Sequence, residues 1–328
     1  MKSALTRDLF SEIFQLLSWK SHNYFTAFYN LPNKFIKEFK PHWFFKFPIL
    51  QGIAAKLINV PQIKWKSIYL KFQDDVVCKL DYVDPIVPPK GTILIFHGFG
   101  GSSSSVYCKD IAKYFGNFYK VIVYNRRAHV GESKSPILPT HYDKDDLDVV
   151  LNYVKTLDTP IYGVGFSCGA NMLMRYVGES GNNCIFKKVL TCGNAWDFDH
   201  ATKNIRSEWG NEILCKMSKS VFLNVKGSFK MHSSFRNQES EAFFNGDETK
   251  LVEYYKRISA INYIDTVSIP CLCMDTLDDK FYLYHDLKSV VTRNSNLSFI
   301  FTSHGGHCCW IQKLWGEKYY ISVLKNWI

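Results

Sequence analysis

The chain has 328 residues, of which 46% are hydrophobic and 21% are charged. These fractions are typical of a globular protein, and they exclude a disordered, collagenous or coiled-coil chain. The net charge is +10, but residues 1–66 hold ten Lys and Arg against three Asp and Glu, a local balance of +7. The basic character therefore belongs mainly to the N-terminal segment, and since it matches no recognised nucleic-acid-binding motif, no nucleic-acid partner is expected.

The ten cysteines include no C-x-x-C pair and no His/Cys spacing typical of a zinc site. Free thiols persist in reducing compartments, so we expect a cytoplasmic protein without a bound metal. No run approaches the ~18–20 apolar residues of a membrane span. The N-terminus also lacks the apolar core of a signal peptide.

Residues 1–66 form a predicted N-terminal extension that is basic and rich in aromatic residues. Leu9, Ile13 and Leu16 recur at helical spacing beside Lys20, which predicts an amphipathic helix. Basic side chains interleaved with Phe and Trp suit the headgroup layer of an anionic membrane. The alternative is that the aromatic side chains pack on the main domain, so peripheral membrane contact is one of two open hypotheses.

The main domain is predicted over residues 67–328 and begins with a β-hairpin, 68–72 and 76–82. Short apolar runs then alternate with helical stretches, which indicates an α/β fold with a mostly parallel, doubly wound sheet. The interval of about 196–265 has no apolar strand and is predicted to be a helical insertion over the sheet. The predicted parallel strands are 92–96, 121–124, 160–165, 188–192, 270–274 and 297–302.

The strongest local motif is G-x-S-x-G around Ser167, between a predicted strand and a predicted helix. Such a turn presents its serine at the end of the sheet, and the glycines permit the close backbone approach that the turn requires. A dinucleotide loop does not fit, because the spacing from Gly163 to Gly169 is one residue too long and no acidic residue follows the next strand. Ser167 is therefore the candidate nucleophile, and no organic cofactor is expected.

A nucleophilic serine needs a base and an acid that orients the base, and in doubly wound hydrolases both follow the serine along the chain. Asp278 and Asp279 come after one predicted strand, and His304 and His307 come after the next. We favour His307 as the base, because the two preceding glycines would let its ring turn back toward Ser167. We favour Asp279 as the acid, because more loop separates it from the strand, but the sequence leaves both pairs open.

Acyl transfer also needs hydrogen-bond donors for the developing oxyanion. The predicted donors are the backbone N–H groups of Cys168, which follows the nucleophile, and of Phe99, in the glycine-rich loop after the first parallel strand. We interpret His97 at the start of this loop as a structural histidine. Arg126 and Arg127, after the next strand, are interpreted as loop-stabilising residues.

Together these motifs resemble the α/β-hydrolase superfamily, and specifically its AB hydrolase 4 family, over residues 67–328. The resemblance implies an α/β-hydrolase fold, a triad of the favoured serine, aspartate and histidine, and a lid formed by the insertion. Ala128, Cys168 and Lys280 stand where the family usually has Gly, Leu and Pro, without removing a catalytic group. The motifs that carry the resemblance are 97–107, 125–127, 145–147, 165–171, 254–255 with Ser259, 278–279 and 305–307.

The predicted function is hydrolysis of carboxylic esters, with a lipid ester such as an acylglycerol or phospholipid as the substrate. Ser167 would attack the carbonyl carbon, His307 would take the serine proton and later activate water, and Asp279 would orient the imidazole. One alternative is a thioesterase or amidase that uses the same residues. The other is a catalytically silent protein that keeps the fold to bind a lipid or a protein.

Overall fold

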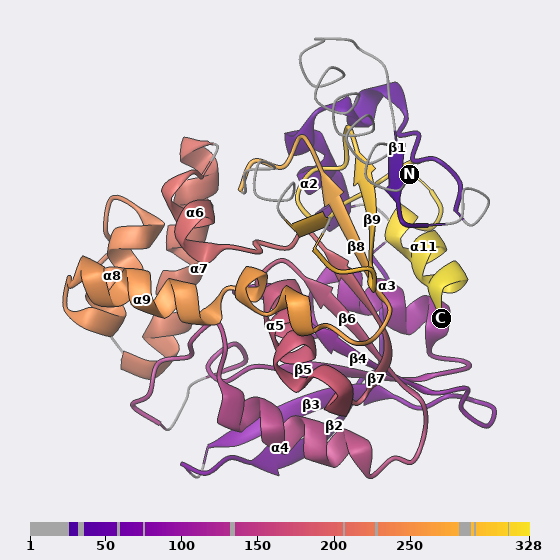
Figure 1. Cartoon of the computed structure of the whole chain (residues 1–328), viewed down its shortest axis with the longest axis horizontal. Coiled ribbons are helices and arrows are strands. Elements are labelled where there is room, and N and C mark those ends of the chain that lie inside the picture. Colours follow the sequence, from indigo (N-terminus) through magenta and orange to yellow (C-terminus); the bar gives the residue numbers. More distant parts are fainter. Residues whose placement is uncertain are drawn as a thin grey trace.

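The computed structural model describes most of the chain from residue 26 onward (Figure 1). The amphipathic helix predicted around Leu9, Ile13 and Leu16 lies outside the described residues. The described ranges are 26–31, 36–57, 60–74, 76–131, 135–205, 207–226, 229–281, 290–291, 293–313 and 315–328.

In the described part of the chain, nine strands form one sheet at the centre of the molecule. They are β1 (Thr26–Tyr29), β2 (Lys66–Lys71), β3 (Val77–Val83), β4 (Thr92–Phe96), β5 (Lys120–Asn125), β6 (Ile161–Phe166), β7 (Phe186–Cys192), β8 (Cys271–Thr276) and β9 (Leu297–Thr302). Their order is β1-β9-β8-β7-β6-β4-β5-β3-β2, with parallel pairing from β9 to β5. β1 is antiparallel to β9, and the β2–β3 hairpin is antiparallel to β5. The predicted α/β fold, a mostly parallel sheet with an N-terminal antiparallel hairpin, is confirmed.

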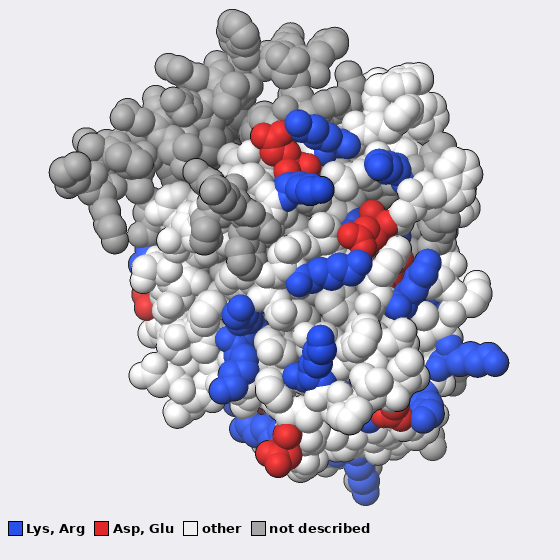
Figure 2. Space-filling view, turned by 90° about the vertical axis from the view of Figure 1, so that its right-hand side faces the viewer, with Lys and Arg blue, Asp and Glu red and all other residues white. Residues whose placement is uncertain are grey.

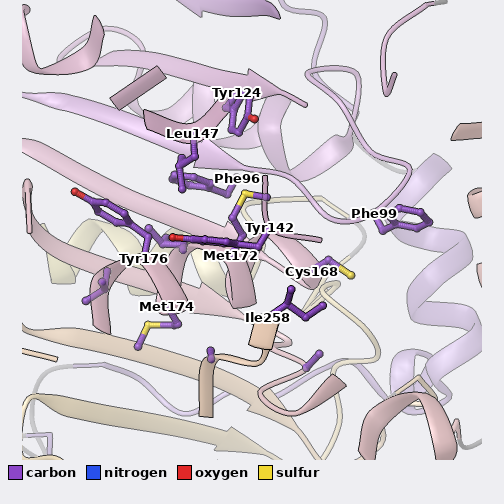
Figure 3. Close-up of a cluster of buried hydrophobic side chains, with 14 of the residues drawn as sticks. Phe96, Phe99, Tyr124, Tyr142, Leu147, Cys168, Met172, Met174, Tyr176 and Ile258 are labelled. Carbon is purple, nitrogen blue, oxygen red and sulfur yellow. The ribbon is translucent and has the colours of Figure 1, made fainter. Parts of the chain in front are cut away.

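Helices cover both faces of this sheet, and those against its central strands are α3 (Val106–Phe115), α4 (Lys144–Lys155), α5 (Cys168–Ser180) and α11 (Tyr319–Trp327). Side chains along a strand point alternately to opposite faces. In β4, Leu94 and Phe96 therefore join the core under α4 and α5, part of which is shown in Figure 3. Ile93 and Ile95 join the second core, under α3 and α11. Both faces are buried, as in a doubly wound sheet.

The interval between β7 and β8 is helical in its described part, and its helices lie to the left of the sheet in Figure 1. Asp197, Ser234 and Asp247 each cap a helix here, because each side chain accepts a hydrogen bond from the backbone N–H three residues later. The helices are α6 (Phe198–Lys203), α7 (Glu208–Lys226), α8 (Phe235–Phe244) and α9 (Glu248–Ile258), followed by the 3₁₀ helices η3 (Ala260–Asn262) and η4 (Ile264–Thr266), while η2 (Gly181–Asn183) precedes β7.

Part of the predicted N-terminal extension is built into the sheet and the core. β1 extends the sheet beyond β9, and Phe39 and Phe45 are each only 1% exposed, so some of the aromatic side chains do pack on the main domain. The 3₁₀ helix η1 (Trp43–Lys46) and the helix α2 (Pro48–Leu57) follow. The sequence did not predict β1, because four residues are too few to show a clear alternation; the strand depends on its pairing with β9.

The positive charge of the described surface is dispersed on the side shown in Figure 2. Lys and Arg side chains outnumber Asp and Glu side chains there, and several of the two kinds lie next to each other. Among the described helices, none is long and apolar enough to cross a membrane.

Candidate active site

Ser167 occupies the turn between the end of β6 and the start of α5. Its φ of 54° and ψ of −125° are unusual for a residue with a side chain. The turn is held by the Ser167 N–H, which donates to Cys192 O at 2.9 Å at the end of the neighbouring β7. Such strain persists only where the surroundings enforce it, as in a nucleophile elbow at the carboxyl edge of a parallel sheet.

The two glycines that flank Ser167 are required by close backbone contacts. A Cβ atom on Gly169 would lie 2.2 Å from Phe96 O, and one on Gly165 would lie 2.6 Å from Ala170 Cα. Both distances are far below van der Waals contact, so any side chain would separate β6, α5 and β4. Close packing of the backbone therefore explains why both flanking positions of the motif are glycine.

His307 connects the loops that follow β8 and β9 to this turn. Its Nε2 lies 2.8 Å from Ser167 Oγ, and its Nδ1 lies 2.6 Å from Asp279 Oδ2. When Nδ1–H donates to Asp279, Nε2 accepts from the serine hydroxyl, which is the tautomer that a general base needs. Gly306 precedes His307 with a φ of 59°, a value that favours glycine. The structure thus brings together three residues that the sequence singled out.

The surroundings of His307 favour its protonated form. Burial by itself lowers the pKa of this imidazole, but the charge and hydrogen bond of Asp279, together with the neighbouring Cys308, raise it, and the pKa lies well above its ordinary value. The ring of Phe281 packs beside it, with the two ring centroids 4.7 Å apart. An imidazolium formed next to Ser167 would therefore be stabilised where it is needed.

Asp278 and His304, the two alternatives, have other partners. Asp278 Oδ1 accepts a hydrogen bond from Gly306 N–H at 2.9 Å, so this carboxylate joins the loop after β8 to the loop that carries His307. Burial raises the pKa of Asp278 to about 6. His304 Nδ1 is hydrogen-bonded at 2.8 Å to the hydroxyl of the preceding serine. The geometry therefore brings Asp279, and not Asp278, to the imidazole of His307.

The predicted oxyanion donors, the backbone N–H groups of Phe99 and Cys168, belong to the loop after β4 and to the start of α5. Cys168 is the first residue of α5 and directly follows Ser167. The loop of Phe99 lies against the turn, since a Cβ atom on Gly98 would be 3.2 Å from Ser167 Cβ. The Tyr107 hydroxyl accepts a hydrogen bond from Gly98 N–H at 2.9 Å and holds this loop. Figure 3 shows Phe99 and Cys168 on the same side of the hydrophobic cluster.

His97 is buried at the start of the same loop and is hydrogen-bonded through both ring nitrogens. Its Nδ1 lies 2.7 Å from Gly98 O, and its Nε2 accepts from Arg126 N–H at 3.3 Å. Burial and the charge of Arg126 lower the pKa of His97 to about 3, so the ring is neutral. These contacts are those of a structural histidine that joins two loops.

A comparison with protein families matches residues 91–278 to the α/β hydrolase fold. The chain belongs to the α/β-hydrolase fold family. The superfamily resemblance inferred from the motifs is thereby confirmed.

Several curated proteins and solved structures similar to this α/β hydrolase are named esterases, lipases or phospholipases. It is 25% identical to "Medium-chain fatty acid ethyl ester synthase/esterase 2" of Saccharomyces cerevisiae, over 77% of this chain and 64% of that protein. It is 23% identical to "Phospholipase ABHD3" of Homo sapiens, over 83% and 73% of the two chains. The Pyrococcus furiosus esterase Pf2001 superposes with a TM-score of 0.54 at 18% identity, over 83% of this chain and 98% of that chain, which shows a shared fold. The matched region thus spans just under two thirds of the yeast protein.

Arg127 of the hydrolase is engaged in ion pairs inside the protein. Its guanidinium binds Asp146 through Nε at 2.5 Å and Nη2 at 2.6 Å, and binds Asp74 through Nη1 at 2.7 Å. The hydrogen bond from Arg127 lowers the pKa of Asp74 to about 2. Arg127 therefore stabilises loops, as predicted. Among the described residues, no group of three or more His, Cys, Asp or Glu side chains could hold a metal ion.

Sequence reasoning missed a buried ion pair beside the site. His141 Nε2 lies 2.7 Å from Glu239 Oε1 on α8, and neither side chain is more than 1% exposed. Burial alone lowers the pKa of His141, but the charge of Glu239 and the contact with Cys168 together raise the pKa to about 9. The His141 ring lies 5.0 Å from that of Phe99, between centroids. The pair belongs to no motif and is 98 residues apart in the chain, so only the fold reveals it.

Proposed function

We propose that this protein is a serine hydrolase that cleaves carboxylic esters of lipids. The observation that carries the proposal is the series of hydrogen bonds from Ser167 Oγ through His307 to Asp279. The names of its relatives add support, because esterases and phospholipases of this kind hydrolyse carboxylic esters.

In the proposed reaction, His307 Nε2 takes the proton of Ser167 as Oγ attacks the ester carbonyl carbon. Asp279 holds the imidazole in the required tautomer and stabilises its cation. The N–H groups of Phe99 and Cys168 donate to the oxyanion, a contribution of roughly 3–4 kcal/mol per donor. The alcohol leaves with the proton from His307, and the same residue then activates water to release the acid from the acyl-serine.

The side chains around the site favour a substrate with an apolar chain. Met217 of α7 lies over the loop after β4, because a Cβ atom on Gly100 would be 2.9 Å from Met217 Cε. Phe281, which packs on His307, also contacts Trp209 of α7, with centroids 5.6 Å apart. We propose that the insertion acts as a lid over a lipid acyl chain, and that the enzyme meets its substrate at an anionic membrane.

Labelling with a fluorophosphonate probe tests the proposed nucleophile. Wild type should react covalently, Ser167→Ala should not, and Ser104→Ala, which alters an exposed serine in the same region of the site, should react like wild type. Circular dichroism establishes that each variant is folded. A folded wild type that never reacts would contradict the proposal and favour a silent lipid- or protein-binding protein.

The same triad could act on a thioester or an amide, so the bond type needs its own measurement. We expect an oxygen ester to be hydrolysed faster than a thioester or an amide of the same acyl chain, at equal concentrations. The reverse order would indicate a thioesterase or an amidase. A series of acyl-chain lengths then defines the substrate class.

A further inference from the structure

Six large hydrophobic side chains are exposed within residues 43–57, on η1, on α2 and at Phe47 between them. We call them the apolar face. A soluble surface usually shows such residues singly, and a contiguous group marks an interaction site. Their exposed fractions are Trp43 66%, Phe44 47%, Phe47 61%, Ile49 55%, Ile53 50% and Leu57 77%.

The apolar face is held outward by contacts on the opposite side of α2. Ile49, Ile53 and Leu57 are four residues apart and so share one side of the helix. Gln51 and Ala54, on the other side, are 0% and 6% exposed. The exposure of the face is therefore a property of a fixed helix.

This anchoring connects the apolar face to the candidate active site. Gln51 Nε2 donates to Ile311 O at 3.1 Å, and Ile311 N–H donates to Gln51 Oε1 at 2.8 Å. A Cβ atom on Gly306 would lie 3.2 Å from Gln51 Cβ. α2 thus packs against the loop that carries His307, so the thickness of one helix separates the apolar face from that loop.

The charge of the surrounding sequence indicates what covers the face. Residues 40–57, which include the apolar face, contain three lysines and neither Asp nor Glu, although Lys40 Nζ lies 2.9 Å from the carboxylate of Glu38. Tryptophan and lysine beside aliphatic residues suit the interface of a bilayer with anionic headgroups. A second copy of this chain is a poorer occupant, because two such segments would bring like charges together.

We propose that the apolar face docks onto an anionic lipid bilayer and holds the mouth of the active site at the membrane surface. This inference rests on the proposed function, in that a lipid-ester hydrolase must take its substrate from a lipid phase. The six hydrophobic side chains enter the interfacial layer, and the positive charge of the same segment favours anionic headgroups.

Flotation of the full chain with vesicles tests the proposal. Vesicles of phosphatidylcholine alone are compared with vesicles that also contain phosphatidylglycerol. Wild type should float mainly with the anionic vesicles, and Ile53→Gln/Leu57→Gln should lower that partition roughly tenfold. The matched control is Ile86→Gln/Val87→Gln, which removes side chains that are 79% and 42% exposed between β3 and β4, at the end of the sheet far from α2 in Figure 1. The control should float like wild type.

The proposal is overturned if wild type does not float with anionic vesicles, or if both double variants float equally. It is also overturned if sedimentation velocity shows a wild-type dimer that Ile53→Gln/Leu57→Gln dissociates, because the face would then be covered by a second copy. Ser167→Ala, tested in parallel, should float like wild type. If docking holds but the fluorophosphonate probe never reacts, the proposed function fails and the membrane surface stands.

Discussion

Asp278 and Asp279 are neighbours in the chain, but their side chains have different partners. Asp279 Oδ2 is bonded to His307 Nδ1, whereas Asp278 accepts from Gly306 N–H. Asp279 would orient the imidazole of His307, and Asp278 would support the loop that carries it. Replacing each carboxylate in turn by an amide measures these two roles separately.

We expect Asp279→Asn to lower kcat about 10³–10⁴-fold, because the amide favours the wrong tautomer of His307 and cannot stabilise its cation. Asp278→Asn keeps an acceptor for Gly306 and should lower kcat only roughly tenfold. Steady-state kinetics on a water-soluble ester measure both values. If Asp278→Asn proves the more damaging variant, Asp278 is the triad acid.

Gly169 illustrates how steric contact, and not reactivity, selects a residue near the proposed nucleophile. A Cβ atom there would lie 2.2 Å from Phe96 O, whereas one on Gly52 in α2 would have no atom within 4 Å. We expect Gly169→Ala to lower the free energy of unfolding by roughly 3 kcal/mol. Gly52→Ala should raise it by about 0.5–1 kcal/mol, through helix propensity. Urea denaturation measures the free energy of unfolding of both variants. Equal values would show that the backbone around Ser167 can shift to accommodate a Cβ atom at little cost.

At the scale of elements, the His141–Glu239 pair ties α8 to the loop before α4. Glu239 also accepts from the Tyr255 hydroxyl at 2.6 Å, which adds α9 to the network. Removal of one partner from a buried ion pair leaves the other charge uncompensated. The packing of the insertion on the domain therefore depends on this pair.

We expect Glu239→Gln to lower the free energy of unfolding by about 3 kcal/mol at neutral pH. The pKa of His141 is raised to about 9 in the folded protein, so the stabilisation is complete below about pH 6.5 and is lost as pH rises toward 9. The difference in the free energy of unfolding between Glu239→Gln and wild type should therefore become smaller as pH rises from about 6.5 toward 9. Denaturation at several pH values measures this difference. Glu212→Gln, which breaks an exposed pair with Lys216, should change little at any pH, and a similar loss in both variants would contradict this account.

At the scale of the whole molecule, β1 covers the edge of the sheet at β9. Asn30 Nδ2 donates to Ser295 O at 2.7 Å, and Ser298 Oγ donates to Asn30 O at 2.9 Å, so side chains reinforce the backbone pairing. An uncovered edge strand can pair with another molecule. A short strand from the start of the chain thus protects the last strand of the sheet.

Removal of residues 1–31 should therefore lower the thermal midpoint by several degrees and promote self-association that increases with concentration. Removal of residues 1–25 keeps the strand and should leave both properties close to those of wild type. Differential scanning calorimetry and light scattering provide the two measurements. Identical behaviour of the two truncated proteins would show that β1 does not protect the edge.

Local sequence patterns were sufficient to predict the class of the fold and the candidate nucleophile. Alternating apolar runs and helical stretches predicted the parallel strands within a few residues, because the periodicity of side chains reports which faces are buried. The G-x-S-x-G motif around Ser167 identified the elbow, since only glycine tolerates the contacts at Gly165 and Gly169. The later aspartates and histidines were found as pairs.

The sequence by itself therefore determined the α/β class and the identity of the candidate serine. It also determined the order in which the candidate serine, aspartates and histidines follow their strands along the chain. Only the tertiary structure decided that Asp279 faces His307, that β1 closes the sheet, and that His141 meets Glu239. The physical reason is the same in each case. Periodicity and motifs record interactions between near neighbours, whereas these contacts join residues that only the folded chain brings together.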